Sequence, residues 1–394
     1  MPCYIPKKDN DLIISDVKIY RVNFKIHESR RIYYRTFNKI QNIFVVIKTN
    51  EDLIGIGEST PIKSITGDSK TTALRFLAQA KTILKGCDPC DLISIHEMLG
   101  NTSRKFRLTS NTAINAIDSA CYDLLGKNKK KPVYQVIRKC RSKNVLNTVT
   151  IYLGSLKNTE NETRNIMTKY QRCGIKRIKL KLSGQPKIDK KRVVTVAKLF
   201  PGDLTLDANE AYRDERIAVK IFNNIYDIVG DRILLIEQPS PRMNLEKLRY
   251  ITERSKIPIF ADESTANLQD LYTIIESNSV NGVNIKLQRA GGIYWGNKMF
   301  VLAKKNKLDV MVGSIQESGV GVSQDVNFLT SISDYVIGSD IDTDLDLEKD
   351  IVTRSSRIPF KNGGRLPLKD HGLGLKIKNS VKTLMGTTSK IDVD

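Results

Sequence analysis

The stretch Arg177-Ile178-Lys179-Leu180-Lys181-Leu182 is a short run of the kind that forms a buried β-strand, and two lysines interrupt it at alternate positions. The next such run, Asp203-Leu204-Thr205-Leu206, begins after a stretch long enough for one helix and two short loops. A strand, a helix and a second strand in this order are typical of a βαβ unit, whose two strands are parallel. This unit predicts a parallel sheet with helices packed on it.

Similar runs recur along the chain, roughly 21 to 30 residues apart, which leaves room for one strand and one helix in each unit. The eight runs span residues 149–152, 177–182, 203–206, 233–236, 257–261, 282–285, 309–312 and 335–337. Eight units favour a closed sheet, because an open sheet has no reason to stop at eight. The sequence therefore predicts an α/β fold with a (β/α)8-type barrel over residues 145–366.

The N-terminal region has a different pattern and predicts an α+β domain over residues 1–140. Stretches rich in β-branched residues at 12–20 and 42–49 predict strands, and helical periodicity covers residues 70–85 and 111–125. Between them, the Gly-, Pro- and Thr-rich segment at residues 55–69 predicts a loop.

Charged residues stand in or directly after most of the predicted barrel strands. Asp207, Glu237 and Asp262 follow three consecutive runs. In a (β/α)8 barrel these positions converge at one mouth, where the active site lies. Three carboxylates on one side of the mouth are hard oxygen ligands suited to a small divalent cation, so the sequence predicts a Mg²⁺ site.

Lysines are the candidate bases. Lys179 and Lys181 are separated by one residue, so both side chains are expected to face the barrel interior. Two ammonium groups near a divalent cation disfavour each other's protonation, and we expect lowered lysine pKa values that suit a general base. Lys286, four strands further on, would lie across the mouth from Lys181. A base on each face of a carbon next to a metal-bound carboxylate predicts epimerisation of that carbon.

Five motifs carry a family resemblance. They are Ile178-Lys179-Leu180-Lys181, Asp207-Ala208-Asn209-Glu210, Glu237-Gln238-Pro239, Ala261-Asp262-Glu263-Ser264 and Asn284-Ile285-Lys286-Leu287-Gln288-Arg289-Ala290-Gly291-Gly292. In this order and spacing the chain resembles the enolase superfamily, in its muconate-lactonising subgroup, and is most similar to dipeptide epimerases. Enzymes of this superfamily combine a lysine or histidine base with magnesium, and the resemblance implies the same combination here.

The resemblance implies roles for these residues. Lys181 and Lys286 would be the two catalytic bases, and Lys179 would assist electrostatically near the substrate carboxylate. One Mg²⁺ per subunit would bind Asp207, Glu237 and Asp262. The barrel would be the modified TIM barrel of the superfamily, and the N-terminal capping domain, joined by the C-terminal segment 367–394, would close over its mouth.

Further matches bear on the substrate. Asp340-Ile341-Asp342 resembles the Asp-x-Asp that holds the substrate's ammonium group in dipeptide epimerases, and Arg35 resembles an arginine that pairs with an acidic substrate side chain. Thr150 is also expected to bind substrate. These matches imply epimerisation of an L-Ala-D/L-Glu-like dipeptide at the α-carbon of its C-terminal residue. Because Asp344 and Asp346 continue the alternation, a shift in register stays open.

Other reactions stay open as alternatives. The same lysines and metal serve N-acylamino acid racemases, o-succinylbenzoate synthases and muconate cycloisomerases. The Asp-x-Asp argues against these, because their substrates lack a free ammonium group at that place. Tyr152 and the segment Gln316-Glu317-Ser318-Gly319-Val320 depart from the family's pattern, and both departures bear on the shape of the pocket.

Composition excludes several classes of protein. The formal net charge of +21 is spread along the chain, so we expect no nucleic-acid partner. No apolar run reaches the roughly 18 residues of a membrane helix, and residues 1–8 lack the apolar core of a signal peptide, so we expect a cytoplasmic protein without a membrane partner. The six scattered cysteines predict reduced thiols. We expect a homo-oligomer that acts on a small molecule.

Overall fold

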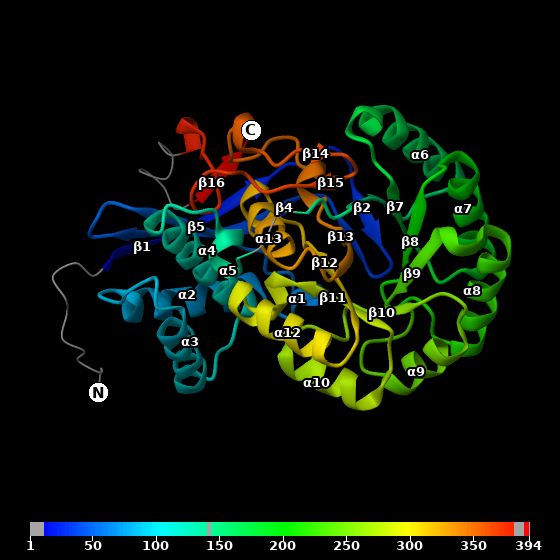
Figure 1. Ribbon diagram of the computed structural model, residues 1–394, viewed down its shortest axis with the longest axis horizontal. Helices are drawn as coiled ribbons and strands as arrows, with labels where there is room; N and C mark the ends of the chain where they lie inside the picture. The colour runs from blue at the N-terminus through cyan, green and yellow to red at the C-terminus, as the bar shows by residue number, and fades with distance from the viewer. Residues whose placement is uncertain (1–11, 140–142, 382–389, 394) are drawn as a thin grey trace.

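Eight parallel strands form one sheet in the computed structural model, which describes residues 12–139, 143–381 and 390–393 (Figure 1). In chain order the strands are β6 (Thr148–Ile151), β7 (Arg177–Lys181), β8 (Asp203–Asp207), β9 (Ile233–Glu237), β10 (Ile259–Ala261), β11 (Gly282–Lys286), β12 (Asp309–Gly313) and β13 (Val336–Asp340). Each strand pairs with the next, and β13 lies beside β6, where the N–H of Ser339 donates to the carbonyl of Leu146 over 3.0 Å. The predicted barrel is confirmed.

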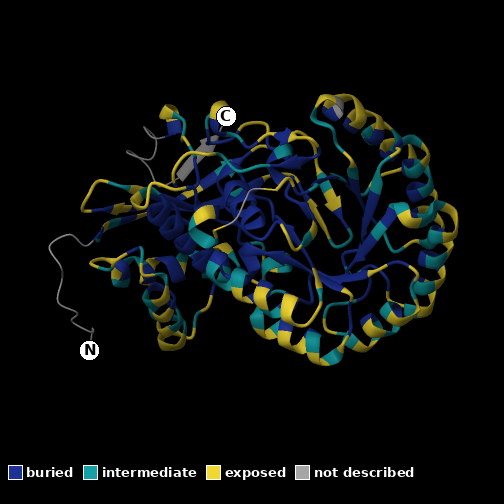
Figure 2. Ribbon diagram, in the orientation of Figure 1, coloured by how far each residue is buried: buried dark blue, intermediate teal, exposed yellow. Residues whose placement is uncertain are grey.

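Helices cover the outer face of the barrel (Figure 1). They are α6 (Leu156–Tyr170), α7 (Pro186–Leu199), α8 (Glu215–Val229), α9 (Leu245–Arg254), α10 (Leu268–Ser277), α11 (Leu287–Ala290), α12 (Ile293–Lys305) and α13 (Gly319–Ser331). In α8 the buried residues Ala218, Ile221, Phe222 and Ile225 recur at three- and four-residue spacings, which places one stripe of the helix on the sheet. Figure 2 shows the buried strands inside and the exposed outer faces of these helices.

The last barrel unit differs from the prediction of one helix per strand. In the described part of the chain β13 is followed by the 3-10 turns η3 (Thr343–Asp346) and η4 (Arg354–Ser356) and by the hairpin of β14 (Phe360–Lys361) and β15 (Gly364–Arg365). Leu347, Ile351 and Val352 pack into the same apolar cluster as Val22 and Phe24 of the N-terminal region. Burial against that region replaces burial against the barrel.

The N-terminal region forms a second sheet, in the order β16-β1-β4-β5, with helices on it. Its elements are β1 (Ile14–Phe24), β2 (Arg30–Ile32), β3 (Arg35–Phe37), β4 (Ile40–Thr49), β5 (Ile54–Ser59), α1 (Lys63–Thr66), α2 (Lys70–Leu84), α3 (Leu92–Phe106), α4 (Asn111–Asn128) and α5 (Val133–Ile137). The C-terminal strand β16 (Lys390–Val393) pairs in parallel with β1. Two predicted strands and two predicted helices are confirmed, as β1, β4, α2 and α4. The domain boundaries stay predictions, and residues 1–11, 140, 382–389 and 394 of the predicted capping domain lie outside the described residues.

The predicted loop at residues 55–69 is wrong in its first part, because β5 runs from Ile54 to Ser59 and pairs with β4. Its glycines meet α4 closely. A Cβ on Gly57 would lie 1.9 Å from the carbonyl oxygen of Ala116, and one on Gly55 would lie 2.3 Å from that of Ala120. Glycine in a strand can mark close approach of another backbone as well as a turn, and here the close approach explains it.

No helix among the described residues is long and apolar enough to cross a membrane. Cys87, Cys90, Cys121 and Cys173 are free thiols, whereas Cys3 and Cys140 lie outside the described residues. Residues 1–8, which were predicted to lack the apolar core of a signal peptide, also lie outside the described residues.

Candidate active site

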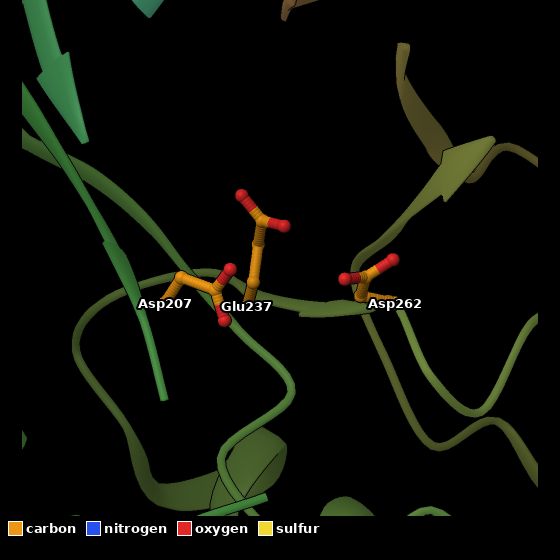
Figure 3. A group of neighbouring side chains, drawn as sticks. All are labelled: Asp207, Glu237 and Asp262. Carbon is orange, nitrogen blue, oxygen red and sulfur yellow. The ribbon is translucent and has the colours of Figure 1, made fainter. Parts of the chain in front are cut away.

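Three carboxylates meet at the carboxyl ends of three adjacent strands. β8 ends at Asp207, β9 ends at Glu237, and Asp262 directly follows β10. The strand register places Asp207 beside Glu237. One oxygen of each carboxylate lies within 4.8 Å of one oxygen of the other two, and all three side chains are buried. Figure 3 shows them side by side, with Glu237 between Asp207 and Asp262.

The chemistry of this donor set fits a small divalent cation. All three donors are carboxylates, the hard oxygen ligands that Mg²⁺ prefers. Burial raises the pKa of Glu237 to about 8 against the opposing effect of Lys179, while Lys181 and Lys179 overcome burial and hold the pKa of Asp207 at about 2. A divalent cation would favour the ionised form of every carboxylate in the group.

Lys179 lies beneath the carboxylates and contacts two of them. Its Nζ lies 2.8 Å from Oε1 of Glu237 and 3.2 Å from Oδ2 of Asp207, and it also contacts Asp340. The carboxylates alone do not produce the expected lowered lysine pKa at Lys179 and Lys286, and the lowering by a divalent cation stays a prediction. Burial lowers the pKa of each amine, but Asp340, Glu237 and Asp207 at Lys179, and Asp262 and Asp340 at Lys286, outweigh it and raise the pKa.

Lys181 and Lys286 approach one cavity from different sides. Lys181 ends β7 and Lys286 ends β11, four strands further round the barrel. The Lys181 ammonium lies 2.5 Å from Oδ2 of Asp207, and the Lys286 ammonium lies 2.8 Å from Oδ2 of Asp262. Each amine is therefore held by one carboxylate of the group, at opposite ends of the row that these carboxylates form.

The cavity between the two amines has a volume of about 60 Å³. Its lining comes from the barrel mouth and from the β2–β3 hairpin that covers it, and includes Ile32, Tyr34, Phe37, Thr150, Tyr152, Lys181, Asp262, Glu263, Lys286, Gln316, Asp340 and Asp342. Lys179, Asp207 and Glu237 lie below this lining. A ligand that entered here would meet both amines and Asp262 directly.

The acidic segment that begins at the end of β13 divides into two pairs of aspartates. Asp340 and Asp342 line the cavity, and Oδ2 of Asp342 accepts the backbone N–H of Thr150 over 2.7 Å. Asp344 instead lies 2.8 Å from the buried Arg365, and Asp346 lies 2.7 Å from Arg30. The structure therefore has the predicted register, in which Asp340 and Asp342 face the cavity, and not the register shifted toward Asp344 and Asp346.

Arg35 does not reach the cavity. It is exposed on β3, its guanidinium donates to the hydroxyl of Ser64 over 3.1 Å, and it stacks over Phe37. Its neighbour Tyr34 lines the cavity instead, and the Tyr34 hydroxyl donates to Oε1 of Glu263 over 3.0 Å. Tyr34 stands in the turn between β2 and β3, and this turn brings its ring to the cavity.

Several contributors had no predicted role. The buried Arg289 contacts Asp262, and Nδ2 of Asn284 donates to Oε2 of Glu237 over 3.0 Å. Asn284 could have been found from its two-residue spacing to Lys286, which puts both side chains on one face of β11. Tyr34 and Glu263 left no such signal, since a loop and a hairpin bring them together. Tyr152 lines the cavity, and its hydroxyl donates to Asp346 over 2.8 Å. This residue departs from the family's pattern, and its position shows that the departure changes the lining of the cavity.

The mouth loops also hold unusual backbone. Asn209, Glu210, Gln238 and Gln316 adopt positive φ values of 42°, 69°, 37° and 47°. Non-glycine residues in this region are strained, and such strain persists where the surroundings fix the conformation. The loops after β8, β9 and β12 therefore place strained backbone at the candidate site.

Two family models match the chain. The model described as mandelate racemase / muconate lactonizing enzyme, N-terminal domain, matches residues 14–137, and the model described as enolase C-terminal domain-like matches residues 162–381.

Several characterised relatives cover nearly the whole chain. An N-succinyl-L-Arg/Lys racemase of Bacillus cereus is 27% identical over 92% of this chain and 95% of its own length. A hydrophobic dipeptide epimerase of Enterococcus faecalis is 28% identical over 86% of this chain and 93% of its own. An L-Ala-D/L-Glu epimerase of Clostridium acetobutylicum is 27% identical over 93% of this chain and 99% of its own.

Solved structures agree with the fold. A dipeptide epimerase from Enterococcus faecalis, complexed with Mg and the dipeptide L-Leu-L-Tyr, has a TM-score of 0.84 and 27% identity, over 92% of this chain and 99% of that one. The N-succinyl Arg/Lys racemase from Bacillus cereus has a TM-score of 0.86 and 25% identity, over 95% of this chain and 98% of that one.

Proposed function

Because the chain belongs to the family of mandelate racemase and muconate lactonizing enzyme, in the enolase superfamily, we propose that it is a Mg²⁺-dependent epimerase of dipeptides. The observation that carries the proposal is the pair of amines, Lys181 and Lys286, that line one cavity from opposite ends of a row of three carboxylates. Its relatives with racemase and epimerase activities at about the same identity support the class of reaction.

The two amines would divide the reaction between them. One lysine, in its neutral form, removes the proton from the α-carbon of the substrate's C-terminal residue. The opposite lysine, as an ammonium, returns a proton to the other face, and the configuration inverts. Burial of both amines keeps water from exchanging with the carbanion before it is reprotonated.

Asp207, Glu237 and Asp262 would hold the metal. When bound, Mg²⁺ stabilises the negative charge that moves onto the substrate carboxylate as the proton leaves. Lys179, fixed beneath the same carboxylates, adds positive charge to this end of the site. Arg289 and Asn284 hold Asp262 and Glu237 in position, as groups behind metal ligands commonly do.

Asp340 and Asp342 favour a dipeptide over an N-acylated amino acid. Both line the cavity, and Asp342 has no cationic partner among the described residues, whereas Asp340 contacts Lys179. A free ammonium group at Asp342 would form a charge-assisted hydrogen bond. An acylated nitrogen has no charge there, so the racemase, synthase and cycloisomerase reactions of the superfamily are disfavoured. The L-Ala-D/L-Glu preference stays a prediction that depends on Arg35.

The test is deuterium incorporation. We expect the protein with Mg²⁺ in deuterium oxide to exchange one α-hydrogen of L,L-dipeptides and to form the epimer, detected by mass spectrometry and chiral chromatography. Lys181→Ala and Lys286→Ala should each lower epimerisation by roughly 10² to 10⁴-fold. Each variant should keep exchange with only one epimer, and the retained epimer should differ between the two variants.

Lys220→Ala is the matched control, because this exposed lysine lies on the outer helix α8. Exchange of N-acylamino acids in place of dipeptides would overturn the substrate class. Full epimerisation by either cavity-lysine variant would overturn the two-base mechanism.

A further inference from the structure

A second cavity adjoins the catalytic one and shares Thr150, Tyr152 and Asp342 with it. Its volume is about 590 Å³, within the range of cavities that hold small ligands. It is lined by β6, helix α6, the segment after β13 and residues 27–30, and neither Lys181 nor Lys286 lines it. A ligand whose ammonium group met Asp342 could extend into this second cavity.

One wall of the second cavity is apolar. Val149 and Ile166 are buried in the main core of the barrel, and Tyr170 and Leu345 pack beside them. These residues offer a hydrophobic surface to the methylene groups of a long side chain. Such a surface suits an amphipathic side chain, which can bury its aliphatic stem and keep its charged end on a polar partner.

The charges around this wall are unbalanced. Arg30 is paired with Asp346 over 2.7 Å and with Glu28 over 3.6 Å, and the hydroxyl of Tyr152 also donates to Asp346, so the charge of Arg30 is already matched. Lys169 lies at the exposed rim, 5.3 Å from the centre of the Tyr170 ring. Asp342 and Glu162 line the same cavity and have no cationic partner among the described residues.

Neighbouring arginines form no ion pair with Glu162 among the described residues. Arg192 influences Glu162 electrostatically, but its guanidinium donates to the carbonyls of Lys181 and Tyr152 and to the hydroxyl of Thr159. Burial raises the pKa of Glu162, with Arg30 acting in the opposite direction, and burial with Asp346 raises the pKa of Asp342 to about 7. Two partly desolvated carboxylates without a cationic partner favour a ligand that carries two positive charges.

We propose that this second cavity is the subsite for the N-terminal side chain of the dipeptide, and that Glu162 selects a basic side chain such as that of lysine, ornithine or arginine. The inference rests on the proposed function. The α-ammonium group binds Asp342, the aliphatic stem lies along Val149 and Ile166, and the terminal cation binds Glu162. Glu162 is then a specificity-determining residue, and an acidic N-terminal side chain is disfavoured at this position.

The experiment compares kcat/KM for three substrates that differ only at the N-terminus: L-Lys-L-Ala, L-Ala-L-Ala and L-Glu-L-Ala. We expect the wild-type protein to prefer L-Lys-L-Ala over L-Ala-L-Ala by about 10-fold or more, and to use L-Glu-L-Ala least, from the size of charge-pair effects in binding sites. Glu162→Gln should reduce the Lys-to-Ala ratio by about 10-fold, and Glu162→Lys should raise relative use of L-Glu-L-Ala.

Glu160→Gln is the matched control, since Glu160 lies on the same helix but pairs with Arg164 on the surface and does not line the cavity. It should keep the wild-type ratio. Exchange of all three dipeptides without preference, or an unchanged ratio in Glu162→Gln, would overturn the subsite while leaving the proposed function intact. Absence of exchange with every dipeptide would overturn the proposed function, and the subsite with it.

Discussion

The floor and the rim of the candidate active site are built in different ways. The floor consists of six buried residues on or next to strand ends. Lys179 and Lys181 pair with Asp207, Lys179 also pairs with Glu237, and Lys286 pairs with Asp262. The rim consists of Tyr34 and Arg35 on the β2–β3 segment, held by single hydrogen bonds to Glu263 and Ser64.

Backbone pairing explains this contrast. Parallel strands in register, from β7 to β11, fix the floor, so displacement of one group disturbs several ion pairs. Loops and short hairpins move more easily than the elements they connect. Changes in the floor should therefore abolish turnover, whereas changes in the rim should have small effects.

The largest effect should come from the middle carboxylate of the floor. Glu237→Gln removes one anionic ligand and disturbs Lys179 and Asn284, which contact it. We expect Mg²⁺ affinity, measured by isothermal titration calorimetry, and kcat to fall by more than about 100-fold, since even groups behind metal ligands can cost that much. Glu276→Gln, on the exposed face of α10, is the control. Wild-type Mg²⁺ affinity in Glu237→Gln would show that the floor does not bind the metal.

The next largest effect should come from a methyl group placed within the floor. A Cβ on Gly313 would lie 2.3 Å from Oδ1 of Asp340, 2.8 Å from Oδ1 of Asn284 and 2.8 Å from Cε of Lys286. All three contacts are with side chains, so Gly313→Ala should displace these groups rather than unfold the barrel. We expect kcat to fall by roughly 100-fold, the cost of a misplacement of about 1 Å. Unchanged turnover, with a Tm near that of the wild type, would show that the floor tolerates movement.

The same contrast explains what could be predicted from the sequence. A parallel strand leaves a strong pattern, and the residue at its end has a known position in a barrel, so the floor followed from spacing alone. The glycines of β5 were misleading because single-sequence patterns do not distinguish a turn from close packing against a helix. The rim depends on which hairpin side chain faces inward. That is a one-residue choice, and it gave Arg35 a predicted role where Tyr34 lines the cavity.

The pKa values of the lysines show a second limit of prediction from the sequence. The sequence predicted mutual repulsion between two amines near a cation, and it assigned Asp340 to the substrate's ammonium group rather than to a lysine. Asp340 contacts Lys179 from β13, a strand far from β7 in the chain. Electrostatic balance in a buried site depends on every charge within a few ångströms, and spacing along one strand gives only a few of them.

The seam between the capping sheet and the barrel should affect stability rather than turnover. Glu58 on β5 is buried and accepts the backbone N–H groups of Ser318 over 3.0 Å and of Gly321 over 2.8 Å. Burial raises the pKa of Glu58 to about 8, against the opposing effect of Ser318. The folded state then keeps a proton that the unfolded state loses above its ordinary pKa of 4.5, so stability falls as pH rises from 4.5 to 8.

Glu58→Gln should reduce that loss. We expect the Tm of the variant, relative to the wild type, to rise by several degrees between pH 5 and pH 8.5, because a carboxyl pKa that folding raises from 4.5 to about 8 changes stability by roughly 4 kcal/mol over this range. The buried Glu317 and Asp325 also have raised pKa values, so part of the dependence of stability on pH should remain in the variant. Glu97→Gln, exposed on α3, is the control. A constant difference in Tm across this range would show that Glu58 is ionised throughout.

The smallest effect should come from the rim. If Arg35 paired with an acidic substrate side chain, Arg35→Ala would lower kcat/KM for L-Ala-L-Glu by about 10-fold or more relative to L-Ala-L-Ala. The exposed guanidinium contacts Ser64 and Phe37 and does not line the cavity, so we expect a change of less than about twofold for both dipeptides, within the size of a single surface contact. A selective loss with L-Ala-L-Glu would mean that the β2–β3 hairpin turns Arg35 inward when substrate binds. The rim would then differ from the floor in its mobility. Arg35 would pair with the acidic C-terminal residue of the substrate, as predicted.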